Sequence, residues 1–304
     1  MRVIINMLRV PNLLMIALLF FILRYLVFIP VYVAYSIKTG ITNLHFQLMV
    51  VATILIASAG YIANDYFDVE TDSINKPQKQ YIGKQLTSGG TLAMALAFSL
   101  LAVILAFWLS VVAQSKVPAG LLLLALSVAW WYALRLKKSL LWGNIAVACM
   151  TSGTIVMAWL IEIQCSAVAD EPYRIITGIV TAVSIFALLL SLIREIVKDM
   201  EDIEGDKLIN CRSLPIVKGI PFTKRFLLIC TAITFVLLIV AQVYLFQFSR
   251  IIAAIWLLVF VEIPLVYFAL ALKKAITRND FHKLSTWLKW IMLGGFGAIA
   301  AGQL

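Results

Sequence analysis

The chain has 304 residues, of which 63% are hydrophobic and 13% are charged, and its formal net charge is +10. Soluble domains are about half apolar and about a quarter charged, so this composition excludes an ordinary soluble protein and predicts a protein embedded in a lipid bilayer. A basic chain can bind nucleic acid, but the lysines and arginines here are sorted into alternate connections, as in membrane proteins. We therefore expect no nucleic-acid partner.

Nine apolar stretches are long enough to cross a bilayer, because a helical span needs about 20 residues. In chain order they lie at 12–36, 45–67, 91–113, 117–135, 140–162, 174–197, 224–246, 251–272 and 286–303. No linker divides them into separate domains. The sequence thus predicts an all-α polytopic membrane protein, with a single bundle of nine transmembrane helices forming one membrane-embedded domain over residues 1–304.

The basic residues also predict an orientation. They are concentrated in the N-terminal segment and in the connections after the second, fourth, sixth and eighth stretches. The other connections hold few, namely Lys38, Lys116, Arg174 and Arg250. Since cytoplasmic loops carry the excess of Lys and Arg, we expect a cytoplasmic N-terminus, cytoplasmic loops after the even-numbered spans, and a C-terminus outside.

The second and sixth stretches each end in a cluster of carboxylates. "NDYFDVETD" (64–72) and "KDMEDIEGD" (198–206) share the pattern D-x-x-D-[VI]-E-x-D. Its aspartates are Asp65, Asp68 and Asp72 in the first motif and Asp199, Asp202 and Asp206 in the second. On a continuous helix this spacing places each set on one face. The remaining acids, Glu70, Glu201 and Glu204, fall off those faces, and we expect them to be solvated.

These carboxylates are placed unfavourably unless they bind cations. They lie near the negative end of a helix dipole, and like charges three and four residues apart repel. Oxygen ligands without Cys or His indicate Mg²⁺, Ca²⁺ or Mn²⁺, and Mg²⁺ completes its shell with water and substrate phosphate. Basic residues adjoin both motifs: Lys76, Lys79 and Lys84 follow the first, and Arg194 and Lys198 lead into the second. We expect a diphosphate bridged by metals between the motifs and contacted by these cations.

Two other classes of membrane protein also use intramembrane acids. An ion or metal transporter predicts carboxylates near the middle of the bilayer on interrupted helices, whereas these clusters lie at the ends of spans beside basic loops. A membrane alcohol phosphotransferase continues its repeated aspartates with D-G-x-x-A-R, which neither motif does. The transporter stays as a remote alternative.

The paired motifs resemble those of the UbiA superfamily of intramembrane prenyltransferases, which have N-D-x-x-D-x-x-x-D on the second helix and D-x-x-D-x-x-x-D on the sixth. Three further stretches are similar to the family, "RVPN" (9–12), "INKPQK" (74–79) and "YALRLKKSLLWGN" (132–144). In the second of these the family often has arginines where this chain has lysines. The resemblance extends over most of the chain.

The resemblance implies an enzyme in which Mg²⁺ bridges a polyprenyl diphosphate to both motifs, the C1–O bond ionises, and an acceptor traps the allylic cation. The motifs look most like the branch that adds a second geranylgeranyl chain to geranylgeranylglyceryl phosphate. Prenylation of an aromatic acid in quinone biosynthesis is the alternative, because sister branches have similar motifs. The expected partners are thus a polyprenyl diphosphate, a lipid or aromatic acceptor and the bilayer, with the oligomeric state left open.

The resemblance also implies a set of site residues. Those carried over as Mg²⁺ ligands or their supports are Asn64, Asp65, Asp68, Asp72, Asp199, Asp202 and Asp206, among which Asp68, Asp72, Asp199 and Asp202 are the expected catalytic residues. Those expected to contact the diphosphate or the acceptor are Lys76, Lys79, Tyr132, Lys137, Arg194 and Lys198.

Overall fold

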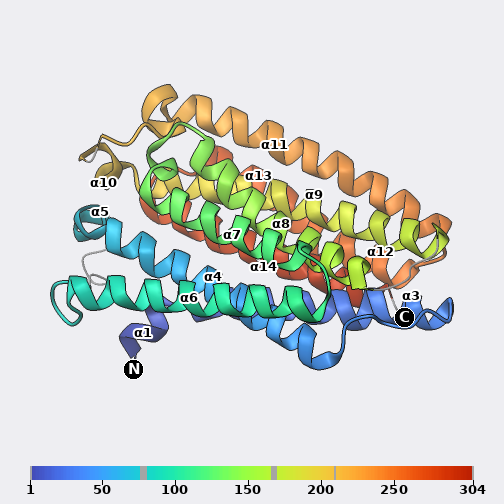
Figure 1. Ribbon diagram of the computed structural model, residues 1–304. Coiled ribbons are helices and arrows are strands. Elements are labelled where there is room, and N and C mark those ends of the chain that lie inside the picture. Colours follow the sequence, from blue (N-terminus) through green and yellow to red (C-terminus); the bar gives the residue numbers. More distant parts are fainter. Residues whose placement is uncertain (1, 76–80, 166–169, 209, 303–304) are drawn as a thin grey trace. The chain divides into compact units, whose positions relative to one another are not determined.

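The computed structural model describes residues 2–75, 81–165, 170–208 and 210–302, and its regular structure is helical (Figure 1). The elements are α1 (Arg2–Met7), α2 (Val10–Leu23), η1 (Arg24–Phe28), α3 (Ile29–Ala34), α4 (Asn43–Phe67), α5 (Val69–Asn75), α6 (Ser88–Val112), α7 (Val117–Leu134), η3 (Leu136–Lys138), α8 (Trp142–Cys165), α9 (Asp170–Glu201), α10 (Ile203–Leu208), α11 (Leu214–Gln247), α12 (Ile251–Leu257), η4 (Leu258–Glu262), α13 (Ile263–Lys274) and α14 (Arg278–Ala301).

Within the described ranges, nine helices are long and apolar enough to cross a membrane, and all nine coincide with predicted stretches. The all-α polytopic prediction is confirmed. The largest differences are that α9, α11 and α14 extend into polar flanking sequence, where the apolar pattern ends but helical hydrogen bonding continues. The start of α11 is set apart by a kink at Gly219, which has a φ of 81° and precedes Pro221.

The described chain divides into two compact units. Unit 1 comprises Met1–Lys137 and Gly153–Val180, and unit 2 comprises Lys138–Ser152 and Thr181–Leu304. The first carboxylate motif belongs to unit 1 and the second to unit 2.

In unit 1, α4 packs against α6 and α7, and Figure 1 shows α4 and α6 running side by side. Alanines fill much of this contact, including Ala59 and Ala63 on α4 and Ala95 on α6. Small side chains let helices approach closely where lipid provides no hydrophobic driving force between them. A cluster around Ile62 and Met7 then packs α1 against the end of α4, directly beside the first motif.

The first span contains a wide turn and a buried charge. Residues Arg24–Phe28 form a π-helical segment, in which the Ile29 N–H donates to the Arg24 carbonyl, and Pro30 follows. Proline lacks an N–H and its ring displaces the carbonyl one turn earlier, which accounts for the widened turn at this position. The Arg24 side chain is buried and donates from Nη1 to Glu162 Oε2 at 2.8 Å.

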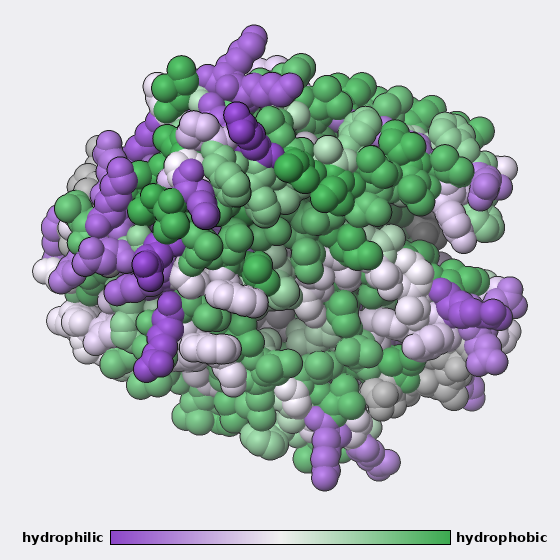
Figure 2. Space-filling view, turned by 90° about the horizontal axis from the view of Figure 1, so that it is seen from above, coloured by the Kyte–Doolittle hydropathy of each residue, from purple (hydrophilic) through white to green (hydrophobic). Residues whose placement is uncertain are grey.

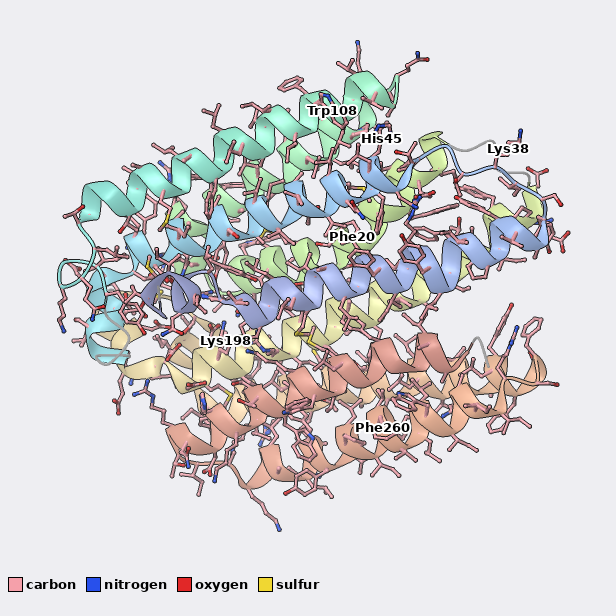
Figure 3. All side chains as sticks on the ribbon, turned by 90° about the horizontal axis from the view of Figure 1, so that it is seen from below. Phe20, Lys38, His45, Trp108, Lys198 and Phe260 are labelled. Carbon is pink, nitrogen blue, oxygen red and sulfur yellow. The ribbon has the colours of Figure 1, made fainter. Side chains whose placement is uncertain are left out.

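In unit 2, α14 packs closely on α12, η4 and α9. The glycines of α14 permit the approach: a Cβ on Gly294 would meet the Phe260 carbonyl oxygen at 2.5 Å, and one on Gly297 would meet the Trp256 ring at 2.5 Å. Trp256 Nε1 also donates to the Gly294 carbonyl at 3.0 Å. Phe260 is labelled in Figure 3.

The outer surface suits a bilayer. Figure 2 shows a face dominated by hydrophobic residues, with hydrophilic side chains gathered toward its margins. On α6, for example, Leu100, Ile104 and Val111 are exposed. Large apolar side chains exposed in this density identify a surface that contacts lipid. The protein is an integral, multi-pass membrane protein.

Candidate active site

Both carboxylate motifs lie where a long helix breaks. α4 ends at Phe67 and α5 begins at Val69, so Asp68 lies at the junction; α9 ends at Glu201 and α10 begins at Ile203, so Asp202 occupies the corresponding position. The third aspartate of each motif is therefore carried on a separate short helix, whereas the spacing argument assumed one uninterrupted helix.

The helix dipole gives a physical reason for these breaks. Acidic residues at a helix C-terminus oppose the dipole, whereas acidic residues in a first turn are stabilised by it. After the break, Glu70 and Asp72 lie in the first turn of α5, and Glu204 and Asp206 lie in the first turn of α10. The break thus converts an unfavourable placement of two carboxylates into a favourable one in each motif.

In unit 1, Asp68 is held by an amide and by a lysine. Asn64 Nδ2 donates to Asp68 Oδ2 at 2.6 Å, and Lys137 Nζ donates to Asp68 Oδ1 at 2.5 Å. The Lys137 side chain is only 9% exposed, although it comes from the segment after α7. The sequence identified all three residues, and unit 1 brings them together.

Asp65 has a different counter-ion. Arg9 Nη2 lies 2.8 Å from Asp65 Oδ1, and the Arg9 guanidinium lies 4.9 Å from the centre of the Tyr61 ring. Tyr132 is close enough to interact with the charge of Arg9. Arg9 was not among the predicted site residues, although it opens the "RVPN" stretch that resembles the family.

In unit 2, the second motif is contacted by α8 and α14. Asn144 Nδ2 donates to Asp199 Oδ2 at 2.8 Å. Arg278 Nη2 lies 3.8 Å from Asp202 Oδ1, and His282 Nδ1 lies 2.8 Å from Glu201 Oε1. The prediction that Glu201 is solvated is therefore wrong, since α14 brings an imidazole onto its carboxylate.

The cations before the second motif are also held in place. Arg194 Nη1 and Lys198 Nζ lie 2.7 Å and 2.8 Å from different oxygens of Glu195, which the sequence did not single out. Lys198 is labelled in Figure 3. The spacing of Glu195 and Lys198, three residues apart on a helix, is the signal that could have identified this pair.

The oxygen donors of both motifs fit the chemistry of Mg²⁺, which prefers carboxylate, carbonyl and water ligands. Among the described residues no group of three or more His, Cys, Asp or Glu is arranged to hold a metal ion, but Mg²⁺ typically takes only one or two carboxylates and completes its shell with water and phosphate. Asn64 Oδ1 is buried and has no hydrogen-bond partner in the described structure. It is an acceptor oxygen beside Asp68 that suits such an ion.

Lys76 and Lys79 lie outside the described residues. Tyr132 is half-buried near the end of α7. Asp68 follows the last residue of the second span and Asp202 follows the last residue of the sixth, whereas a transporter predicts carboxylates near the middle of the bilayer. Glu70 and Glu204 are exposed, as predicted.

Comparison with known sequences identifies relatives along most of the chain. Residues 27–300 match the model of the UbiA prenyltransferase family. The digeranylgeranylglyceryl phosphate synthase of Saccharolobus solfataricus is 32% identical over 253 residues, covering 82% of each chain. That of Methanosphaera stadtmanae is 29% identical over 252 residues, covering 82% of this chain and 85% of the relative.

Two solved structures have the same fold. One, of digeranylgeranylglyceryl phosphate synthase, is similar with a TM-score of 0.65 and 21% identity, covering 99% of this chain and 98% of the other. The second, a UbiA homologue from Archaeoglobus fulgidus bound to GPP and Mg²⁺, has a TM-score of 0.59 and 15% identity, covering 98% and 99% of the two chains.

Proposed function

This chain belongs to the UbiA prenyltransferase family, and we propose that it transfers a polyprenyl group from an allylic diphosphate to a membrane-lipid acceptor in a Mg²⁺-dependent reaction. The proposed donor is geranylgeranyl diphosphate and the proposed acceptor is geranylgeranylglyceryl phosphate. The relatives from Saccharolobus solfataricus and Methanosphaera stadtmanae support this choice of substrates by their names. Residues 1–304 act as a single membrane-embedded domain in this proposal.

The observation that carries the proposal is the contact of Asp68 with Asn64 and Lys137. It combines carboxylate and amide oxygens with a nearly buried cation, and both kinds of group are needed to bind a metal-complexed diphosphate. The proposed metal ligands and their supports are Asn64, Asp65, Asp68, Asp72, Asp199, Asp202 and Asp206. When bound, Mg²⁺ neutralises the charge that develops on the leaving diphosphate.

Cationic side chains assist the same step. Lys137, Arg194 and Lys198 are proposed to contact the diphosphate or the phosphate of the acceptor, where contacts that strengthen as the C1–O bond breaks lower the barrier. Tyr132, Lys76 and Lys79 are proposed as further contacts, as the family resemblance implies. The apolar interior of the helical protein excludes water from the allylic cation.

The proposed orientation places the N-terminus and both carboxylate motifs at the cytoplasmic surface and the C-terminus outside. The distribution of lysine and arginine among the connections supports it. The substrates would then be drawn from the cytoplasmic leaflet.

A transfer assay in detergent tests the function. The purified protein receives labelled geranylgeranyl diphosphate and Mg²⁺, with geranylgeranylglyceryl phosphate in one arm and dihydroxynaphthoate in the other, and EDTA as a control. We expect a Mg²⁺-dependent diether product in the first arm. Prenylation of the aromatic acid instead would retain the reaction and contradict the proposed acceptor, and no product in either arm would contradict the proposed function.

Substitutions in the two motifs test the site. Asp68→Asn and Asp202→Asn should each lower kcat/KM by about 100-fold or more, because each removes a carboxylate that would hold the Mg²⁺ needed to neutralise the leaving group. Glu70→Gln, an exposed neighbour of the first motif, is the matched control and should retain activity. Wild-type rates in both aspartate variants would contradict the assignment.

A further inference from the structure

Glu195 lies one helical turn before the second carboxylate motif. Its side chain is 9% exposed, and each carboxylate oxygen serves a different cation: Oε1 lies 2.7 Å from Arg194 Nη1, and Oε2 lies 2.8 Å from Lys198 Nζ. All three residues belong to α9. One carboxylate thus holds together two cations that would otherwise repel each other.

Stability alone does not explain this arrangement. The two ion pairs join residues of the same helix, so they do not tie α9 to a neighbouring element. Ion pairs between neighbouring residues of one helix stabilise it only slightly, whereas burying a carboxylate incurs a substantial desolvation cost. The cluster of two cations and one anion carries a net charge of +1. Because the neighbouring Asp199 is one of the proposed Mg²⁺ ligands, its charge would be matched by the metal, and the cluster is then suited to an anionic ligand.

The donors of Arg194 point to the class of ligand. Its Nη1 is used by Glu195, whereas its Nε is buried and has no hydrogen-bond partner in the described structure. The Nε edge of a guanidinium is a planar pair of donors that matches the oxygens of a phosphate or carboxylate. An arginine that is held through Nη1 while its Nε donor has no partner is oriented to receive an oxyanion at Nε.

We propose that Glu195 is a positioning residue that holds Arg194 and Lys198 as a preorganised pair for a substrate phosphate. This inference rests on the proposed function, because it assigns the pair to one of that reaction's two phosphorylated substrates, either the prenyl diphosphate or the glyceryl phosphate acceptor. Glu195 acts through the two cations. Its own negative charge does not contact the phosphate.

The test is Glu195→Gln in the full-length protein, with Glu204→Gln as a control that removes the same charge from an exposed position. The Gln amide keeps one acceptor oxygen but presents donors toward at least one cation, so the pair is no longer held. Losing a charge-assisted contact should weaken phosphate binding about tenfold. Calorimetry with inorganic pyrophosphate and Mg²⁺ measures binding at the site for the diphosphate of the prenyl donor. The KM for each of the two substrates then identifies which substrate phosphate is affected.

The two sources of phosphate give different results. If the pair binds the prenyl diphosphate, Kd for pyrophosphate and KM for the donor rise together while KM for the acceptor is unchanged. If it binds the acceptor, only KM for the glyceryl phosphate lipid rises. Unchanged pyrophosphate affinity together with unchanged KM values for both substrates would overturn the proposal.

A second variant separates positioning from a purely structural role. In an Arg194→Met/Lys198→Met background, the further change Glu195→Gln should have no additional effect on binding, because the residues through which Glu195 acts are absent. An undiminished effect in that background would overturn the proposal. If Glu195→Gln does not fold, Glu195→Asp retains the charge on a shorter side chain and should give a smaller shift of the same kind.

Failure of this inference differs from failure of the proposed function. A protein that transfers prenyl groups but is unaffected by Glu195→Gln retains the function and loses the positioning role. A protein that binds pyrophosphate less tightly after the substitution, yet transfers nothing in the wild type, retains the phosphate site and loses the function.

Discussion

Arg24 lies within the first membrane-spanning helix and is 1% exposed. The sequence requires only that such a residue pair, face the protein interior or extend to the interface. In unit 1 it pairs with Glu162, donates from Nη2 to the Ile41 carbonyl at 2.8 Å, and places its guanidinium 4.7 Å from the centre of the Phe46 ring. These contacts offset the desolvation of a cation in the bilayer.

The ion pair between Arg24 and Glu162 predicts that substitutions of the two residues have non-additive effects on the free energy of unfolding. Arg24→Met should destabilise the protein by about 3–5 kcal/mol, because it leaves Glu162 buried without its counter-ion. The double variant Arg24→Met/Glu162→Leu should recover most of that loss, since no unpaired charge remains. The unfolding midpoint in detergent, followed by tryptophan fluorescence, measures both. A double variant less stable than Arg24→Met would contradict this account.

At the scale of helices, contact in unit 2 depends on glycine at one face of α14. Gly294 lies against the Phe260 carbonyl of η4, and Gly297 lies against the ring of Trp256 on α12. A backbone carbonyl cannot rotate away as a side chain can, so the position of Gly294 tolerates substitution least. This contact joins the last span to the eighth.

Gly294→Ala should therefore destabilise the protein by about 1–3 kcal/mol, the usual cost of overpacking. The matched control is Gly178→Ala on α9, where an added Cβ meets nothing within 4 Å. This control should be neutral or stabilising by up to about 1 kcal/mol, because alanine favours a helix over glycine. Equal midpoints for the two variants in detergent would show that the approach of α14 is not limited by this glycine.

At the scale of the whole molecule, the number of spans and the distribution of charge together predict the topology. An odd number of spans places the two termini on opposite sides of the membrane, and the described part of the chain contains nine. The basic connections then decide which side is cytoplasmic. The last span is the least apolar of the nine, so its insertion is the step that needs a direct test.

Reporter fusions provide that test. Green fluorescent protein fused after the complete chain should remain dark in a bacterial host, while alkaline phosphatase at the same site should be active, because the C-terminus is expected outside. Fusions made after Lys274, which lack the ninth span, should show the opposite pattern. A fluorescent fusion to the complete chain would reverse the assigned orientation or remove one span.

The sequence by itself determined the features that depend on local composition and spacing. The nine spans can be recognised because a helix that crosses a bilayer needs a long apolar stretch. Both carboxylate motifs can be recognised because cytoplasmic ends of spans usually carry Lys and Arg, whereas these two ends carry acids. Lys137 and Asn64 were identified through their resemblance to a family pattern. None of these inferences required knowledge of which helices pack together.

Only the tertiary structure decided which side chains meet. Lys137 contacts Asp68 although the two residues are 69 positions apart in the sequence. Arg9 and Asp65 are 56 positions apart, and His282 and Glu201 are 81 positions apart. Such pairs form because distant helices pack side by side, and a single sequence carries no signal of that packing. The breaks at Asp68 and Asp202 were likewise missed, because spacing assumes a continuous helix whereas the energy of carboxylates at its end depends on the helix dipole.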